Sequence, residues 1–460
     1  GRPPPPATSS SVAFRLSSPK RPPTSGAATD ARDRRYEVTR RIVPAVRASA
    51  SNPCGNAVQD AGARPSVAPG PQGAEIPAVK TSGAVDACLA VPPLNLGGQF
   101  AGLRSELLAE LTAVAESGYY VLGPKVTAFE EDLARYCGTA HAVGVSSGTD
   151  ALLLALMALG IGPGDEVIVP TFTFFATAGV VSRVGARPVM CDIDPETFNL
   201  DVRQAAALIT PRTKAIIPVH LYGQLADLEA LLPVAARHNV PVIEDAAQAI
   251  GAQDAAGRRA GSFGTFGALS FYPTKNLGAL GDAGALLMSS PELAERARKL
   301  RIHGSGHTYY HEYVGGNFRI DALQAALLRI KLGHLERWTA ERRARAARYN
   351  ALIAAAGLAP EFVQLPVERH GQHVYHQYVL RAQRRDELVA FLKERKIGAA
   401  VYYPLPLHLQ QCFANLGYAA GAFPQAEQAA REVVALPMYP ELTDAQQQAV
   451  VAALAAFYRR

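Results

Sequence analysis

Short β-branched runs alternate with longer helical patterns through most of this 460-residue chain, and no other feature limits its fold as strongly. The pattern predicts strands at 141–147, 166–170, 188–193, 215–221, 240–244 and 283–288, and helices at 149–159, 225–239 and 291–301. Strands that are separated by helices in this way form a mainly parallel sheet with helices on both faces. We therefore expect a three-layer α/β/α domain.

The pattern changes after about residue 320, which predicts a second, smaller unit. A long helical stretch rich in Ala, Leu and Arg covers 320–355, with a break expected near Gly333. A strand at 376–381, a helix at 385–396 and a mostly helical segment at 427–460 follow it. We expect 92–335 to form the large domain and 336–460 a smaller α+β domain.

Residues 1–91 are predicted to form a disordered, basic, proline-rich leader. The first 90 residues hold 13 of the 33 prolines and only two aromatic residues, Phe14 and Tyr36. Such a composition offers too little apolar surface to offset the entropy lost on folding. Its Arg- and Ser-rich start and the lack of an initiator methionine leave three origins open: a transit segment, a fragment, or upstream sequence translated in error.

The net charge of +6 comes from this leader. Residues 1–50 carry ten basic and three acidic side chains, whereas residues 91–460 carry 34 of each. A body without net charge offers no basic surface, so we expect no nucleic-acid partner. The five cysteines form no CxxC pair, no zinc knuckle is supported, and no apolar run is long enough for a membrane span. We expect a cytoplasmic protein without disulfides, metal or membrane segment.

Three separate motifs carry the chemistry. The first, Ser146-Ser147-Gly148-Thr149-Asp150, joins a predicted strand to an apolar helix. Free N–H groups at the start of a helix suit a phosphate, and Gly148 would let the anion approach closely. Taken alone, the motif is equally typical of an ordinary helix cap.

The second motif is Val242-Ile243-Glu244-Asp245-Ala246-Ala247-Gln248, in which a strand runs directly into acidic residues. This places a carboxylate at the carboxyl edge of the sheet, where open α/β sheets bind ligands. Because side chains alternate along a strand, only one of Glu244 and Asp245 can face a site there, and the other can cap or pair.

The third motif, Ser270-Phe271-Tyr272-Pro273-Thr274-Lys275-Asn276-Leu277-Gly278, holds a single lysine in apolar, Gly-containing sequence. Desolvation lowers the pKa of such a lysine and makes it a nucleophile suited to a Schiff base. The alternative is a lysine on a surface loop. Together the three motifs meet the needs of pyridoxal phosphate, namely a phosphate site, an acid for the ring nitrogen and a lysine for the aldehyde.

At this point the sequence resembles the DegT/DnrJ/EryC1/StrS sugar aminotransferases, which are fold-type I pyridoxal phosphate enzymes. The resemblance covers residues 92–460 and rests on six motifs: S-G-T-D-A-L, P-T-F-T-F-x-A-T, V-I-E-D-A-A-Q, S-F-Y-P-T-K-N-L-G, G-N-F-R-I-D-x-L-Q-A-A and Y-Y-P-L-P-L-H. One departure is Gly281-Asp282-Ala283-Gly284, where the family usually has G-D-G-G; no catalytic group is lost by it.

The resemblance implies a role for each matching residue. Lys275 would bind the cofactor covalently and then move the proton between the substrate carbon and C4′ of the cofactor. Asp245 would pair with the pyridinium nitrogen, and Gln248 with the ring hydroxyl. The remaining cofactor contacts would be Gly148, Thr149 and Ser270 at the phosphate, Phe174 on the ring face, and Asn317 at the phosphate of the neighbouring subunit in a homodimer.

The resemblance also implies the reaction. Members move an amino group from L-glutamate to a 3-keto or 4-keto sugar linked to UDP or dTDP, for amino-sugar, polysaccharide or secondary-metabolite biosynthesis. Tyr309, His311 and His408 lie where substrate contacts are expected, although the first two are also consistent with interface packing. Lys275, which dehydrating relatives replace by histidine, argues for transamination.

Three other functions remain open from the sequence: an aminotransferase for an inosose ring of the scyllo-inosose type, another pyridoxal phosphate chemistry such as that of a lyase, and a non-catalytic pyridoxal phosphate-binding regulatory protein.

Overall fold

The structure is a computed structural model that describes residues 89–307 and 309–459. The predicted leader lies outside the described residues except for its last three positions, and there the prediction extends too far. Val91 is fully buried and forms a β-bridge with Ile397. The folded chain therefore begins before residue 92.

Seven strands of the described chain form the central sheet: β1 (His141–Val145), β2 (Glu166–Pro170), β3 (Arg187–Cys191), β4 (Thr213–Ile216), β5 (Ile243–Asp245), β6 (Phe266–Ser270) and β7 (Gly284–Met288). Their order is β1-β7-β6-β5-β4-β2-β3, and the bridges Ile216–Val242 and Val219–Asp245 connect β4 to β5. Every neighbouring pair is parallel except the two pairs that contain β7. The mainly parallel sheet predicted from the sequence is confirmed.

The helices around this sheet are α1 (Leu96–Ser117), α2 (Pro124–Cys137), α3 (Gly148–Leu159), α4 (Ala176–Arg183), α5 (Val202–Ala207), α6 (Leu228–Arg237), α7 (Pro291–Leu300) and α8 (Ala322–Leu332). Alternating residues of β7 show how both faces are covered. Leu286 and Met288 lie in a core with α3, α4 and α7, whereas Ala285 and Leu287 lie in a core with α2 and α8. Two buried faces explain why the strands are apolar throughout rather than alternating.

The C-terminal unit is built from α9 (Leu335–Ala355), β10 (Val363–Gln364), β11 (Tyr378–Ala382), α10 (Arg385–Glu394), α11 (Pro424–Glu432), β12 (Val433–Leu436) and α12 (Asp444–Tyr458). Its strands form an antiparallel sheet in the order β10-β11-β12. The mostly helical segment predicted at 427–460 therefore contains a strand, β12. Its Val-Val-Ala-Leu run has no periodicity that separates a buried strand from a buried helix.

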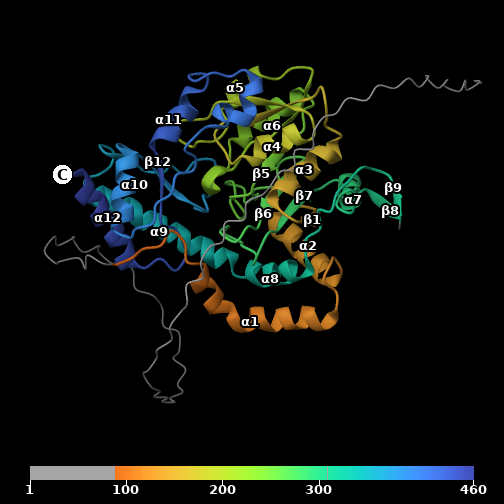
Figure 1. Cartoon of the computed structure of the whole chain (residues 1–460), viewed down its shortest axis with the longest axis horizontal. Coiled ribbons are helices and arrows are strands. Elements are labelled where there is room, and N and C mark those ends of the chain that lie inside the picture. The colour runs from red at the N-terminus through yellow and green to blue at the C-terminus, as the bar shows by residue number, and fades with distance from the viewer. Residues whose placement is uncertain (1–88, 308, 460) are drawn as a thin grey trace, which may run out of the picture. The chain divides into compact units, whose positions relative to one another are not determined.

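The predicted domain boundary after residue 335 falls at the start of α9. Figure 1 shows α1 alongside α8, and α2 packs on α8 as well, while α9 packs against α12. Beyond α7, a short hairpin of β8 (Ser305–His307) and β9 (Tyr310–His311) extends from the body. Within residues 89–307 and 309–459, no helix is long and apolar enough to cross a membrane.

Candidate active site

A cavity of about 630 Å³ opens where β1, β2, β5 and β6 end at one edge of the sheet. This is the carboxyl edge, where open α/β sheets bind ligands. Seven of the predicted site residues line this one cavity: Gly148, Thr149, Phe174, Asp245, Gln248, Ser270 and Lys275. The three sequence motifs, which are far apart in the chain, thus meet at one place.

The first wall of the cavity is the beginning of α3. Ser147 Oγ accepts a hydrogen bond from the backbone N–H of Asp150 over 3.0 Å, and this caps the helix. The N–H groups of Gly148 and Thr149 belong to the first turn, which has no intrahelical acceptor for them. A Cβ on Gly148 would lie 2.6 Å from Cβ of Ser270. The close approach of α3 to β6 therefore requires glycine and leaves a narrow corner suited to an anion.

Asp245 and Glu244 follow each other on β5 and serve different sides of the sheet. Asp245 lines the cavity and is 5% exposed, whereas the Glu244 carboxylate accepts hydrogen bonds from the N–H groups of Gly261, Phe263 and Gly264 over 2.7–2.8 Å. Burial raises the pKa of Asp245, and a 2.8 Å hydrogen bond from Thr177 opposes this rise. Asp245 is thus the member of the pair available to a ligand.

His220 is held on the side of Glu244 and away from the cavity. Its Nδ1 accepts the N–H of Ala226 over 3.0 Å, so its Nε2 carries the hydrogen and donates to Glu244 over 2.8 Å. Both side chains are fully buried. These contacts give His220 a structural position.

Lys275 is the only lysine or arginine among the described residues that line the cavity. Burial lowers the pKa of its ammonium group to about 8, and the nearby charge of Asp245 partly opposes that shift. At pH 7 about a tenth of the molecules therefore carry the uncharged amine, far more than for an ordinary lysine, and the uncharged amine is the nucleophilic form.

Phe174 and Gln248 complete the walls near Lys275. Phe174 is 56% exposed despite its apolar ring, and its ring centroid lies 6.3 Å from that of Tyr403. Gln248 is almost fully buried, and its Oε1 accepts the N–H of Tyr222 over 2.7 Å. An open aromatic face beside a fixed amide can hold a planar ring by contact and by hydrogen bonding.

The other predicted site residues do not line this cavity. Asn317, Tyr309 and His311 are exposed, and Tyr309 is 91% exposed. Tyr309 and His311 belong to the projecting hairpin, where His311 Nδ1 lies 3.0 Å from the carbonyl oxygen of His303. These three side chains are available to a second subunit rather than to the cavity of their own chain.

His408 is buried next to the site and its ring has no open nitrogen. Its Nδ1 lies 2.9 Å from Thr171 Oγ1, and its Nε2 lies 3.1 Å from Glu427 Oε1. Thr171 Oγ1 also accepts the backbone N–H of His408 over 3.2 Å. Because a carboxylate only accepts, Nε2 donates to Glu427, and burial lowers the pKa of His408, so the neutral ring accepts the threonine hydrogen at Nδ1. This geometry does not support the substrate contact predicted for His408; instead the residue ties its segment to the loop after β2.

Several residues that line the cavity were not found from the sequence. They are Thr173, Tyr272, Asp282, His376, Gln377, Tyr402 and Tyr403, together with Thr177 behind Asp245. Burial, followed by the charge of Lys275, lowers the pKa of His376 far below its usual value, so this imidazole is neutral. Only His376 and Gln377 lie outside the segments quoted from the sequence; the others stand in those segments, but nothing there assigned them to the site.

The donor set fits pyridoxal phosphate. The corner of α3 offers free N–H groups to a phosphate, the buried Asp245 carboxylate can pair with a ring nitrogen, and Lys275 can react with an aldehyde. By contrast, among the described residues no group of three or more His, Cys, Asp or Glu side chains is placed to hold a metal ion.

Comparison with known proteins decides the family. Residues 102–455 match the DegT/DnrJ/EryC1/StrS aminotransferase family. The chain belongs to this family. It is therefore an aminotransferase of a pyridoxal phosphate-dependent group, as its motifs predicted.

Three relatives illustrate the likeness. A pleiotropic regulatory protein of Geobacillus stearothermophilus is 52% identical over 370 residues, which cover 80% of this chain and 99% of that protein. The dTDP-3-amino-3,4,6-trideoxy-alpha-D-glucose transaminase of Streptomyces venezuelae is 47% identical over 365 residues, 79% of this aminotransferase and 95% of the relative. The crystal structure of S. venezuelae DesV in complex with a ketimine intermediate has a TM-score of 0.77 and 46% identity, and the match covers 81% of this chain and 99% of that one. This last likeness confirms the fold class.

Proposed function

We propose that this aminotransferase uses pyridoxal phosphate to move an amino group from L-glutamate to a keto carbon of a nucleotide-linked sugar. The observation that carries the proposal is the meeting of Lys275, Asp245 and the free N–H groups of α3 in one cavity. A transaminase for a dTDP-linked sugar at 47% identity over nearly its full length supports the substrate class. UDP and dTDP both remain candidates for the nucleotide, and C3 and C4 for the keto carbon.

When bound, pyridoxal phosphate supplies an electron sink for the substrate carbon that loses its proton. The residues of this chain hold the cofactor and move that proton. Gly148, Thr149 and Ser270 would bind the phosphate, Gln248 the ring hydroxyl, and Phe174 the ring face. Asp245 would keep the ring nitrogen protonated, because a buried carboxylate held by Thr177 cannot turn away from it.

Lys275 would serve as both anchor and base. Its lowered pKa leaves the amine able to bind the aldehyde of the cofactor and, once displaced by the substrate amine, able to accept a proton near neutral pH. The same amine would return this proton at the cofactor carbon, and addition of water would then release the oxo acid and leave the nitrogen on the cofactor. Among the described residues that line the cavity, Lys275 is the only one whose side chain carries an amine.

A homodimer with shared sites completes the proposal. Asn317, Tyr309 and His311 are exposed in the single chain, and we place them at the cavity of the partner subunit. Mixing a Lys275→Ala chain with an Asn317→Ala chain tests this arrangement. Mixed dimers would contain one site with neither change and would regain activity that each variant lacks alone, while sites built from a single chain would regain none.

The function is tested by adding L-glutamate to the full-length protein loaded with pyridoxal phosphate. Loss of the visible cofactor band in favour of the aminated form, with release of 2-oxoglutarate, is the expected result. Keto-sugar nucleotides linked to UDP or dTDP, and scyllo-inosose, are then screened for the ability to restore the band. Lys275→Ala protein is the control and should show neither conversion.

The regulatory name of the relative that is 52% identical favours a second candidate, a protein that binds the cofactor without turnover. Such a protein would keep its visible band after addition of glutamate. The simultaneous presence of Lys275 and Asp245 in the cavity supports the enzyme, because binding alone needs no base at the reacting carbon.

A further inference from the structure

The orientation of the Gln248 amide is fixed by the backbone of Tyr222. Gln248 Oε1 accepts the Tyr222 N–H over 2.7 Å, and both residues are buried. An amide has its oxygen on one side and its NH2 group on the other, so the acceptor identifies which side is which. The Gln248 NH2 group therefore points toward its remaining polar neighbour, Tyr403.

Tyr403 receives that NH2 group and keeps its own hydrogen free. Gln248 Nε2 donates to Tyr403 Oη over 3.2 Å, so the phenol acts as acceptor in this contact. Among residues 89–307 and 309–459, no side chain or carbonyl accepts the Tyr403 hydrogen. A partly buried hydroxyl that lines a cavity and has no protein acceptor is available to a ligand.

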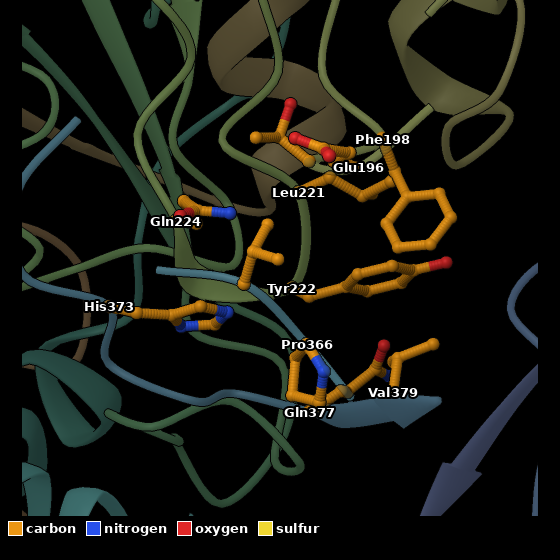
Figure 2. A pocket seen from close by; sticks show the side chains of 11 residues that line it. Glu196, Phe198, Leu221, Tyr222, Gln224, Pro366, His373, Gln377 and Val379 are labelled. Carbon is orange, nitrogen blue, oxygen red and sulfur yellow. The ribbon is translucent and has the colours of Figure 1, made fainter. Parts of the chain in front are cut away.

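The ring of Tyr403 is held in this position from several sides. Its centroid lies 6.1 Å from that of Phe172 and 6.3 Å from that of Phe174. The hydroxyl of Tyr222 donates to the carbonyl oxygen of Tyr402, which fixes the backbone just before Tyr403. Figure 2 shows the ring of Tyr222 beside that of Phe198, and their centroids lie 5.7 Å apart. Tyr222 thus orients both Gln248 and the segment that carries Tyr403.

The protonation state of Tyr403 is equally well defined. Burial raises the pKa of its phenol, and the charge of Asp245 raises it further. The hydroxyl therefore keeps its hydrogen at every pH at which the protein would work. It can donate a hydrogen bond but cannot act as a base.

The oxygen that accepts a hydrogen bond from Tyr403 cannot be the same ring hydroxyl that accepts one from Gln248. The two hydrogens of an amide NH2 group diverge by about 120°. An acceptor on the second hydrogen of Gln248 lies roughly 5 Å from Tyr403 Oη, which is beyond hydrogen-bond reach. If Gln248 binds the ring hydroxyl, Tyr403 must donate to a different oxygen in the cavity.

We propose that Tyr403 is a substrate-binding residue that donates its phenolic hydrogen to an oxygen of the bound substrate, either a carboxylate of glutamate or an oxygen of the keto sugar. This proposal rests on the proposed function. It adds a contact from the C-terminal part of the chain to a cavity otherwise built at the edge of the large sheet. Tyr222 is then a positioning residue, since it acts through Tyr402 and Gln248.

The test compares Tyr403→Phe with the unchanged protein in the two half-reactions, each followed as a single turnover over a range of substrate concentrations. Loss of one hydrogen bond should raise the half-saturating concentration of glutamate or of the keto sugar roughly five- to tenfold. The limiting rate should stay within about twofold, and the dissociation constant of pyridoxal phosphate should not change. The affected half-reaction shows which substrate supplies the oxygen.

The matched control is Tyr458→Phe, which removes a phenol that donates to the carbonyl oxygen of Gln383 in the C-terminal unit, over 2.8 Å. Half-saturating concentrations equal to those of this control in both half-reactions would overturn the proposal. So would weaker binding of pyridoxal phosphate with unchanged substrate constants, because Tyr403 would then contact the cofactor. If the unchanged protein does not react with glutamate, the proposed function itself fails, and this contact fails with it.

Discussion

The hydroxyl of Thr177 donates a hydrogen bond to Oδ2 of Asp245 over 2.8 Å, where neither side chain has appreciable contact with solvent. Thr177 is the last residue of the P-T-F-T-F-x-A-T motif and lies in the first turn of α4, and Asp245 ends β5. The contact therefore joins two motifs that are separated by 68 residues, and it fixes the carboxylate from behind while Oδ1 accepts the N–H of Ala247.

Thr177→Val should remove the hydrogen bond to the Asp245 carboxylate while nearly keeping the volume of the side chain at position 177. Because the hydrogen bond from Thr177 lowers the pKa of Asp245, its loss should raise that pKa further. We expect the dissociation constant of pyridoxal phosphate to rise about tenfold, and more strongly at acidic pH. Titration of the apoprotein with cofactor over a pH series measures this. Thr177→Ser, which keeps the hydroxyl, should behave like the unchanged protein.

The reactivity of Lys275 in cofactor-free protein should reveal its lowered pKa. Acylation of Lys275, followed by mass spectrometry, should reach half of its maximal rate near the pKa of about 8. The charge of Asp245 raises this pKa, so Asp245→Asn should move the midpoint to a lower pH. Lys393, an exposed lysine on α10, provides an internal reference for the reagent. A midpoint unchanged by Asp245→Asn would show that the two groups do not interact.

Gly148→Ala should disturb the corner between α3 and β6. The added Cβ would lie 2.6 Å from Cβ of Ser270, so Ser270 or the helix start must shift. Crowding of this kind costs about 1–3 kcal/mol, and we expect the affinity for pyridoxal phosphate to fall roughly tenfold. Gly102→Ala is the control, because nothing lies within 4 Å of a Cβ at that position. Equal affinities in both variants would argue against a phosphate at this corner.

His408→Phe separates a structural role from a substrate role. The change keeps an aromatic ring beside Phe423, 4.8 Å away between centroids, but removes the hydrogen bonds to Thr171 and Glu427. Two buried hydrogen bonds contribute about 2–4 kcal/mol, so the free energy of unfolding should fall by that amount. Urea unfolding measures it. Unchanged stability together with weaker substrate binding would favour the direct contact predicted from the sequence.

The sequence predicted the sheet well, because strands buried on both faces stand out as apolar runs between amphipathic helices. It also singled out Asp245 and Lys275, both of which line the cavity, because each lies in a short motif whose chemistry is local. It could not show that Asp245 rather than Glu244 faces the cavity: alternation requires opposite directions but does not say which is which. The loop at 261–264 that surrounds Glu244 decides this.

Site residues that are distant from the motifs in the sequence could not be predicted from local patterns. Tyr403 meets Gln248 across 155 residues of sequence, and His376 reaches the Lys275 region across about 100. Neither contact has a local pattern, because each depends on how the C-terminal unit packs against the large sheet. For His408 the motif indicated a place near the site, but it could not show that the ring is bonded to Thr171 and Glu427.

The reversed direction of β7 has a mechanical consequence for Lys275. β6 ends at Ser270 and β7 begins at Gly284, and these two residues pair with each other. The segment that carries the lysine therefore leaves the sheet and returns to it at the same point, without a crossover helix. Backbone hydrogen bonds from the Phe271 N–H to the Ala283 carbonyl and from the Ala279 N–H to the Phe271 carbonyl continue this anchoring into the segment. The reacting amine is therefore carried on a segment whose two ends are fixed to the sheet by one pair of facing residues.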